Sequence, residues 1–295
     1  MLKKNYFFAA LAILLASCNP SNNISEKPLV MVSIMPQKYF VERIADTLVR
    51  VEVLVPPGSS PETYEPTASQ LRSVSSALVL FSLGLLDFEK SLVRSIERQN
   101  PNLLVINLSK GLSLLEGMCH GHHHGHNHSH SHGFDPHVWS SPTEVKHMVR
   151  AIEKVLSEKL PDHSEIFAKN AEVFIKDLES LDSYIQSSFV DVKTRKFFLF
   201  HPALTYYARD YNLIQVALEE DGKAPSMKHF KSVINTAKEQ GVKTIFIQKE
   251  FDVKTAKTAA DDIGGRVEVI DPLDENWLEN MYNITDLLKE AMNGN

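Results

Sequence analysis

Short apolar runs alternate with amphipathic stretches along most of this 295-residue chain. Such an alternation is typical of a parallel sheet covered by helices, because each crossover must carry the chain back to the same edge of the sheet. The pattern occurs twice, over residues 28–160 and again over residues 191–295. Since single hydrophobic cores tend to split above about 250 residues, we expect an α/β fold with two Rossmann-like parallel-sheet lobes.

The boundaries of these segments predict the elements of each lobe. We expect strands at residues 29–34, 51–55, 77–81, 102–108, 197–200, 214–218, 244–247 and 267–270. We expect helices at residues 39–48, 68–74, 142–160, 204–211, 227–239, 254–263 and 281–292. Each lobe is therefore expected to contain a sheet of four strands.

One long helix is predicted between the lobes, over residues 161–190. Its apolar residues recur at steps of three and four, so they share one face of the helix. They are Ile166, Phe167, Val173, Phe174, Leu178, Leu181, Ile185 and Phe189. We expect this helix to be a rigid connector beside a cleft between the two lobes.

The first eighteen residues predict export from the cytoplasm. Lys3 and Lys4 precede the apolar residues 6–16, and Cys18 follows small residues. The apolar run is shorter than the roughly 20 residues of a spanning helix, which favours a cleaved lipoprotein signal peptide over an uncleaved membrane anchor. We expect Cys18 to carry the lipid, residues 19–27 to form a polar tether, and the folded chain to lie in the periplasm or at the cell surface.

Charge and cysteine content exclude some classes of protein. The formal net charge is −6, and acidic and basic residues are interspersed. A nucleic-acid partner would require a basic face, so we expect none. The chain has two cysteines, and because Cys18 is assigned to the lipid, no disulfide with Cys119 is expected.

Eight of the thirteen histidines fall in a short tract between Cys119 and Gly133. They are His120, His122, His123, His124, His126, His128, His130 and His132. Imidazole suits Zn²⁺, Cu²⁺ and Ni²⁺, and the glycine, serine and asparagine spacers cannot build a packed core. We therefore expect a metal-collecting loop over residues 119–132. A purification tag is the alternative, although tags normally stand at chain ends.

Four potential metal ligands follow predicted strands, where open α/β sheets bind their ligands. They are Glu62, His137, His201 and Asp271. All four adjoin a proline, which restricts the neighbouring backbone and suits a preorganised site. Two imidazoles and two carboxylates are an adequate set for Zn²⁺ at about 2.0–2.2 Å, and Mn²⁺ or Fe²⁺ would also tolerate them. Because histidine must be neutral to bind, we expect affinity to fall as the pH drops through about 6.

Each candidate ligand also has a structural interpretation. The two histidines are alternatively hydrogen-bonding residues at strand ends. Glu62 alternatively caps the turn after Pro61, because carboxylates favour helix starts. Asp271 is alternatively a turn residue, in which case water takes its place at the ion.

Four motifs, taken together, resemble one family. They are Gly58-x-x-Pro61-x-x-Tyr64-Glu65-Pro66-Thr67, Asp135-Pro136-His137-x-Trp139, His201-Pro202-Ala203-x-x-Tyr206-x-Ala208-Arg209-Asp210-Tyr211, and Asp271-Pro272-Leu273. On these motifs the chain resembles the ZnuA-type zinc-uptake solute-binding proteins of bacterial metal ABC transporters. The resemblance covers Pro28 to the C-terminus.

The resemblance implies two lobes joined by one long helix, with the ion held in the cleft and delivered to an ABC permease and its ATPase. By position it implies metal-ligand roles for His137, His201 and Asp271. A histidine-rich loop before Asp135 is typical of the zinc members. We accordingly expect a monomeric binding protein and not an enzyme.

Two departures from the family leave alternatives open. Zinc members usually have histidine where this chain has Glu62, so a manganese or iron receptor is the alternative. The second departure is Gln248, which stands where many relatives have glutamate. A metal-dependent hydrolase would need an open coordination position and a general base, and neither a His-Glu-x-x-His nor a Gly-x-Ser-x-Gly sequence occurs in the chain. A surface adhesin or metal-storing lipoprotein would use the loop of residues 119–132 instead of the cleft.

Overall fold

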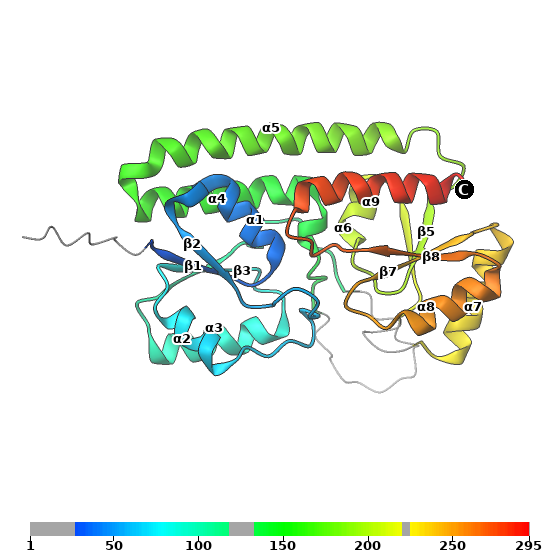
Figure 1. The fold of residues 1–295 in the computed structure, drawn as a ribbon, viewed down its shortest axis with the longest axis horizontal. Helices are drawn as coiled ribbons and strands as arrows, with labels where there is room; N and C mark the ends of the chain where they lie inside the picture. The colour runs from blue at the N-terminus through cyan, green and yellow to red at the C-terminus, as the bar shows by residue number, and fades with distance from the viewer. Residues whose placement is uncertain (1–26, 118–132, 220–224, 295) are drawn as a thin grey trace, which may run out of the picture.

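The computed structural model describes residues 27–117, 133–219 and 225–294. The predicted signal peptide, the lipid-bearing Cys18, most of the tether and the histidine-rich loop of residues 119–132 lie outside the described residues. The described part forms two lobes beneath one long helix (Figure 1).

The N-terminal lobe is built on a four-stranded parallel sheet. Its strands are β1 (Leu29–Val32), β2 (Arg50–Val53), β3 (Val79–Ser82) and β4 (Leu104–Asn107). They pair in the order β2-β1-β3-β4. The two central strands, β1 and β3, are buried along their whole length, as expected for a parallel sheet with helices on both faces.

Helices cover this sheet on both sides (Figure 1). Helices α1 (Met35–Ala45) and α4 (Pro142–Lys159) lie on one side, and α2 (Ala68–Ser75) and α3 (Asp87–Gln99) lie on the other. Pro142 begins α4, where a missing backbone N–H costs nothing.

The sequence pattern does not predict helix α3. Its buried apolar residues are Phe88, Leu92 and Ile96, and charged residues dominate the rest of the helix. With Val93 these residues form a narrow apolar stripe at helical spacing, but the low apolar content of the segment hides it in the sequence. The other expected strands and helices of this lobe are confirmed, with shifts at their ends.

The C-terminal lobe repeats the architecture of the first. Its strands are β5 (Lys196–Leu199), β6 (Ile214–Ala217), β7 (Thr244–Gln248) and β8 (Arg266–Ile270). They pair in parallel in the order β6-β5-β7-β8, which is the winding of the first sheet. Its helices are α6 (Thr205–Asp210), α7 (Met227–Glu239), α8 (Val253–Ile263) and α9 (Trp277–Met292). Helices α7 and α8 lie below the sheet in Figure 1 and α9 lies above it, which confirms the predicted α/β fold of two lobes.

Helix α5 (Ser164–Ser188) runs along both lobes (Figure 1). It packs against α1 and α4 of the first lobe and against α9 of the second. Its 25 residues span about 38 Å. A 3-10 turn (Pro161–His163) precedes it, so the helix begins later than predicted. Ile166 and Val173, which were expected on the apolar face, are 45% and 49% exposed.

One hydrophobic core is shared by the two lobes. A single cluster of buried side chains extends from the first sheet through α5 to residues of β5, α6 and α9. At its centre the Phe40 ring lies 5.1 Å from the Trp277 ring and 6.0 Å from the Phe174 ring, between centroids. A second, smaller cluster lies between the C-terminal sheet and helices α7 and α8. The shared core and α5 together hold the lobes in one arrangement.

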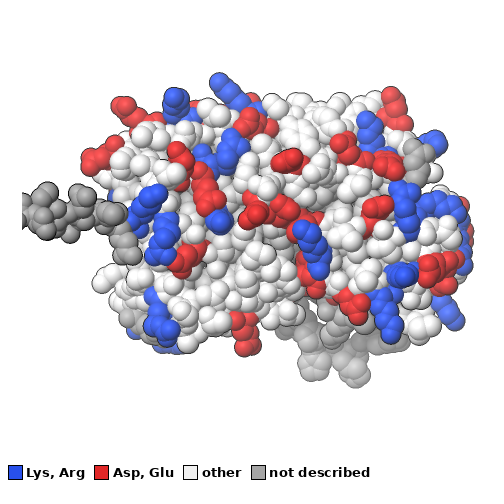
Figure 2. Space-filling model, viewed as in Figure 1, with Lys and Arg blue, Asp and Glu red and all other residues white. Residues whose placement is uncertain are grey.

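None of the described helices has the length and apolar character needed to cross a membrane. Acidic and basic side chains are interspersed on the face drawn in Figure 2, and no single sign dominates that face.

Candidate metal centre

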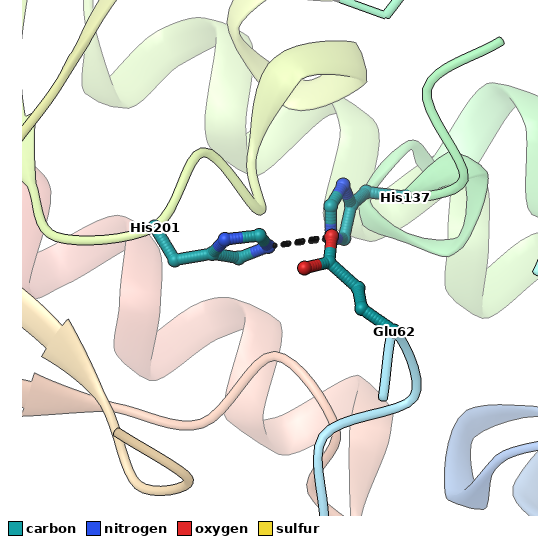
Figure 3. A group of neighbouring side chains, drawn as sticks. All are labelled: Glu62, His137 and His201. Carbon is teal, nitrogen blue, oxygen red and sulfur yellow. Dashed lines mark hydrogen bonds and ion pairs between the residues drawn. The ribbon is translucent and has the colours of Figure 1, made fainter. Parts of the chain in front are cut away.

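Three potential ligands meet between the lobes, each from a different segment of the chain (Figure 3). Glu62 lies in the loop between β2 and α2, and His137 directly precedes the 3-10 turn Val138–Ser140 that leads into α4. His201 follows β5 in the other lobe. Because the three side chains point toward one another, an ion held by all three would bridge the lobes.

The ligand atoms are spaced like the corners of a tetrahedral metal site. His201 Nε2 lies 3.1 Å from His137 Nε2 and 3.2 Å from Glu62 Oε1. In a tetrahedral zinc site with bonds of about 2.0–2.1 Å, neighbouring ligand atoms are about 3.3 Å apart. The three side chains therefore fit a single ion of this size.

The loop that carries Glu62 is anchored at both ends. Backbone hydrogen bonds to the end of β1 continue past β2 as far as Val55. At the other end Thr67 and Gln70 form a capping box that starts α2, and the Tyr64 hydroxyl donates to the Gln70 side chain at 2.8 Å. The anchored loop presents Glu62, whose side chain is 31% exposed, to the two buried histidines.

His137 is held by Asp135. One oxygen of Asp135 accepts a hydrogen bond from the backbone N–H of His137 at 2.8 Å and lies 2.9 Å from the ring atom Nδ1. Both residues are buried, and the Trp139 ring packs beside the imidazole. A carboxylate only accepts hydrogen bonds, so Nδ1 carries a proton and Nε2 is turned toward the other ligands.

His201 is held in the same way from the second lobe. Glu219 Oε2 lies 2.5 Å from His201 Nδ1, and the Phe251 ring stacks on the imidazole at 5.0 Å between centroids. The Gln248 side chain accepts from the backbone N–H of His201 at 3.3 Å and donates to its carbonyl oxygen at 2.6 Å. The amide at position 248 thus fixes the backbone of His201, a task for which both a donor and an acceptor are needed.

The electrostatics of the site favour a positive charge at its centre. With both Nδ1 atoms protonated, the neutral rings direct two Nε2 lone pairs and the Glu62 carboxylate into one space. Burial opposes protonation of His201, but its hydrogen bonds to Glu219 and Glu62 outweigh this and raise its pKa to about 9. Burial likewise opposes ionisation of Glu62, yet the His201 contact holds the pKa of this carboxyl below its usual value. A proton or a metal ion relieves the repulsion between the three electron-rich atoms.

The structure does not bring Asp271 into this group. Its Oδ2 lies 2.9 Å from Lys249 Nζ, and its Oδ1 accepts from the backbone N–H of Leu273 at 3.1 Å. Asp271 therefore occupies a turn at the end of β8, in the manner of the structural alternative considered for it. It lines a separate cavity of about 180 Å³ together with Glu250 and Asp274.

Two cavities adjoin the three ligands. The larger, of about 580 Å³, is also lined by Asp135, Gln215 and Glu219. The smaller, of about 10 Å³, is enclosed by the apolar side chains of Trp139, Phe251 and Leu273 among others. A space of roughly 10–15 Å³ holds about one water molecule. The small cavity suits the ion itself, and the large one gives access to it.

Two carboxylates that orient the histidines were not singled out from the sequence. Asp135 belongs to the motif Asp135-Pro136-His137, which by itself assigns it no role, and Glu219 lies in none of the four motifs. Glu219 directly follows the end of the predicted strand at residues 214–218, so the same rule that selected His201 would have found it. Its partner His201, which lies just beyond the end of β5, becomes apparent only when β5 and β6 are paired.

Comparison with known proteins gives consistent matches. The model of the ZnuA family, described as zinc-uptake complex component A, periplasmic, matches residues 30–291. The high-affinity zinc uptake system protein ZnuA of Bacillus subtilis is 30% identical, across 91% of this chain and 88% of that protein. The zinc-binding lipoprotein AdcA of Streptococcus pneumoniae is 29% identical across 99% of this chain, which spans 61% of the length of AdcA.

Solved structures agree with the sequence matches. A crystal structure of ZnuA superposes with a TM-score of 0.82 at 35% identity, covering 90% of this chain and all of that one. A zinc-bound deletion mutant of ZnuA also has a TM-score of 0.82, at 36% identity over 90% of this chain and 98% of the other. The family match over residues 30–291 and the shared two-lobed fold show that this chain belongs to the ZnuA family of periplasmic zinc-uptake components.

Proposed function

We propose that this chain is an extracytoplasmic receptor that captures Zn²⁺ with Glu62, His137 and His201 and delivers it to an ABC-type permease and its ATPase. The observation that carries the proposal is the convergence of two imidazole nitrogens and a carboxylate oxygen, 3.1 and 3.2 Å apart. The names of the relatives from B. subtilis and S. pneumoniae, which refer to zinc uptake and zinc binding, support zinc as the cargo. Family membership supports a transport component and not an enzyme.

We assign the fourth coordination position to a water molecule and not to Asp271. Asp271 is engaged by Lys249 and the turn at Leu273, so its recruitment would break an ion pair and a backbone hydrogen bond. Substitution Asp271→Ala should then change the zinc dissociation constant by less than about threefold, whereas removal of a direct ligand costs far more.

Outside the described residues, the proposal keeps the predictions made from the sequence. A lipid on Cys18 would hold a monomeric receptor at the membrane, and the histidine-rich loop of residues 119–132 would collect additional, weakly held ions. Deletion of residues 119–132 should leave one tight zinc ion bound. Loss of all tight binding would move the site to the loop and support the storage or adhesin alternative.

The direct test is metal titration of residues 19–295 after chelation, with Zn²⁺ against Mn²⁺, by competition with a chromophoric chelator. His137→Ala and His201→Ala should each abolish tight binding of zinc. His147→Ala is the matched control, because His147 is exposed on α4, away from the three ligands. Retention of tight binding in both site variants would refute the proposal. Preference for Mn²⁺ with the same pattern of variants would reassign the cargo, since the Glu62 oxygen is a harder donor than imidazole.

A further inference from the structure

Glu219 is a buried carboxylate that contacts the candidate metal centre without being one of its three converging ligands. It is 8% exposed and lies just beyond the end of β6. The ladder between β5 and β6 continues past the strand ends, where Leu218 N–H donates to Leu199 O at 2.8 Å and Glu219 N–H donates to Phe200 O at 2.9 Å. The sheet itself therefore places Glu219 beside His201.

The contact determines how the imidazole ring is oriented. Rotation of the His201 ring by half a turn about its Cβ–Cγ bond would exchange Nδ1 with a carbon and turn Nε2 away from the other ligands. Stacking on Phe251 does not prevent this rotation, because a stacked ring presents the same flat face in both orientations. The 2.5 Å contact between Nδ1 and Glu219 Oε2 exists in only one of them. Glu219 also selects the tautomer whose Nε2 lone pair faces the site.

We propose that Glu219 is a positioning residue for metal binding: it locks the His201 ring with Nε2 toward Glu62 and His137 and adds a negative charge behind the ring. This inference rests on the proposed function of the site. His137 and Asp135 form the matching pair in the other lobe, so each lobe contributes one carboxylate–imidazole unit. A carboxylate behind a ligating imidazole makes the ring a stronger donor, and its removal typically weakens binding about 10–100-fold.

The test compares Glu219→Ala and Glu219→Gln with wild type in zinc competition titrations. Glu219→Ala should weaken zinc binding about 10–100-fold. Glu219→Gln keeps an acceptor oxygen without the charge, so it should recover part of this loss. Asp274→Ala is the control for the removal of a carboxylate near the cleft, because Asp274 contacts Lys249 and none of the ligands. It should bind zinc like wild type.

A readout of ring orientation separates positioning from a general loss of fold. In the zinc-bound wild type, ¹⁵N shifts of labelled histidine should show His201 ligating through Nε2 with a protonated Nδ1, and Glu219→Ala should broaden or split this signal. Unchanged affinity and unchanged shifts in Glu219→Ala and Glu219→Gln would overturn the inference. His201→Ala separates a failure of the proposed function from a failure of the role of Glu219. Tight zinc binding in His201→Ala contradicts the proposed function. Loss of tight zinc binding in His201→Ala, together with normal zinc binding in both Glu219 variants, contradicts only the role of Glu219.

Discussion

Glu62 is the most exposed of the three converging side chains and the one at which this chain departs from the zinc members that the sequence resembles. Its loop is tied down by the capping box at Thr67 and Gln70, so the position of the carboxylate depends on the loop and not on packing around the side chain. A ligand supplied in this way can be exchanged without rebuilding the core. The residue at position 62 is therefore suited to tune the choice of metal.

We expect Glu62→His to favour zinc over manganese more strongly than wild type does, because an imidazole replaces a hard oxygen donor. Glu62→Ala should weaken zinc binding about tenfold or more, since two protein ligands remain. Competition titrations with both metals measure the two effects. Glu65→Ala, an exposed carboxylate of the same loop, is the control and should behave like wild type.

The pKa of His201 predicts how the stability of the metal-free protein depends on pH. Hydrogen bonds to Glu219 and Glu62 raise its folded-state pKa from the ordinary 6.5 to about 9, so protonation favours the folded state. This stabilisation is complete below pH 6.5 and is lost as the pH rises through about 9, with an upper bound of about 3 kcal/mol. Urea unfolding of chelated protein at pH 6.5 and pH 9.5 should show the loss. His201→Gln should show a smaller difference between the two pH values; an equal difference would assign the effect to other groups.

The same pKa changes the expected pH dependence of zinc binding. At an ordinary histidine, a proton would compete with zinc only below about pH 6, as the sequence suggested. His201, by contrast, releases its proton near pH 9. Zinc must displace that proton at neutral pH, so we expect the apparent affinity to rise about tenfold per pH unit between pH 6.5 and 8.5. Calorimetry in buffers of different ionisation enthalpy would detect the released proton. An affinity that is constant over this range would contradict the prediction.

At the scale of elements, the site depends on the ends of strands and on the helix that joins the lobes. His201 and Glu219 lie beyond the paired ends of β5 and β6, and Gln248, the last residue of β7, holds the backbone of His201. Parallel pairing therefore brings residues distant in sequence to one edge of the second sheet. Helix α5 keeps that edge facing Glu62 and His137, because it packs on helices of both lobes.

Phe174 is the residue of α5 with which the contribution of its packing to stability can be tested. It is fully buried and packs against the rings of Tyr39 and Phe40. We expect Phe174→Ala to lower the free energy of unfolding by about 3–5 kcal/mol, because it removes a large side chain from a close-packed core. Urea unfolding at constant pH measures the change. Val173→Ala is the matched control, since Val173 is 49% exposed on the same helix, and it should cost less than about 0.5 kcal/mol.

At the scale of the molecule, the lobes are held together by more than the connecting helix. The Trp139 indole donates to Pro272 O at 3.0 Å, and the Trp277 indole donates to Trp139 O at 3.1 Å. The Tyr206 hydroxyl donates to Asp135 O at 2.8 Å, directly beside the ligand His137. These buried contacts cross between the lobes and adjoin the site, so large opening would break several hydrogen bonds at once.

We therefore expect only a small rearrangement when zinc binds. Small-angle scattering profiles of the chelated and zinc-loaded protein should nearly coincide, with radii of gyration within about 0.5 Å, whereas hinged domain closure moves whole domains. The His201→Ala variant provides the reference that does not respond to zinc. A clear decrease in the radius of gyration of wild type on addition of zinc would show that the lobes open in the absence of the ion.

Local periodicity and the residues at strand ends are enough to predict the two α/β lobes, their strands, the joining helix and the three convergent ligands as candidates. The sequence pattern missed α3, which has only four apolar residues among its thirteen, and it included Asp271 among the candidate ligands. Which strand ends face the cleft, and which partner each side chain meets, depend instead on how the elements pack. Asp271 pairs with Lys249 and is not among the three converging side chains, whereas Glu219 reaches His201 from the neighbouring paired strand. Such contacts join residues far apart in the chain, so no local pattern records them.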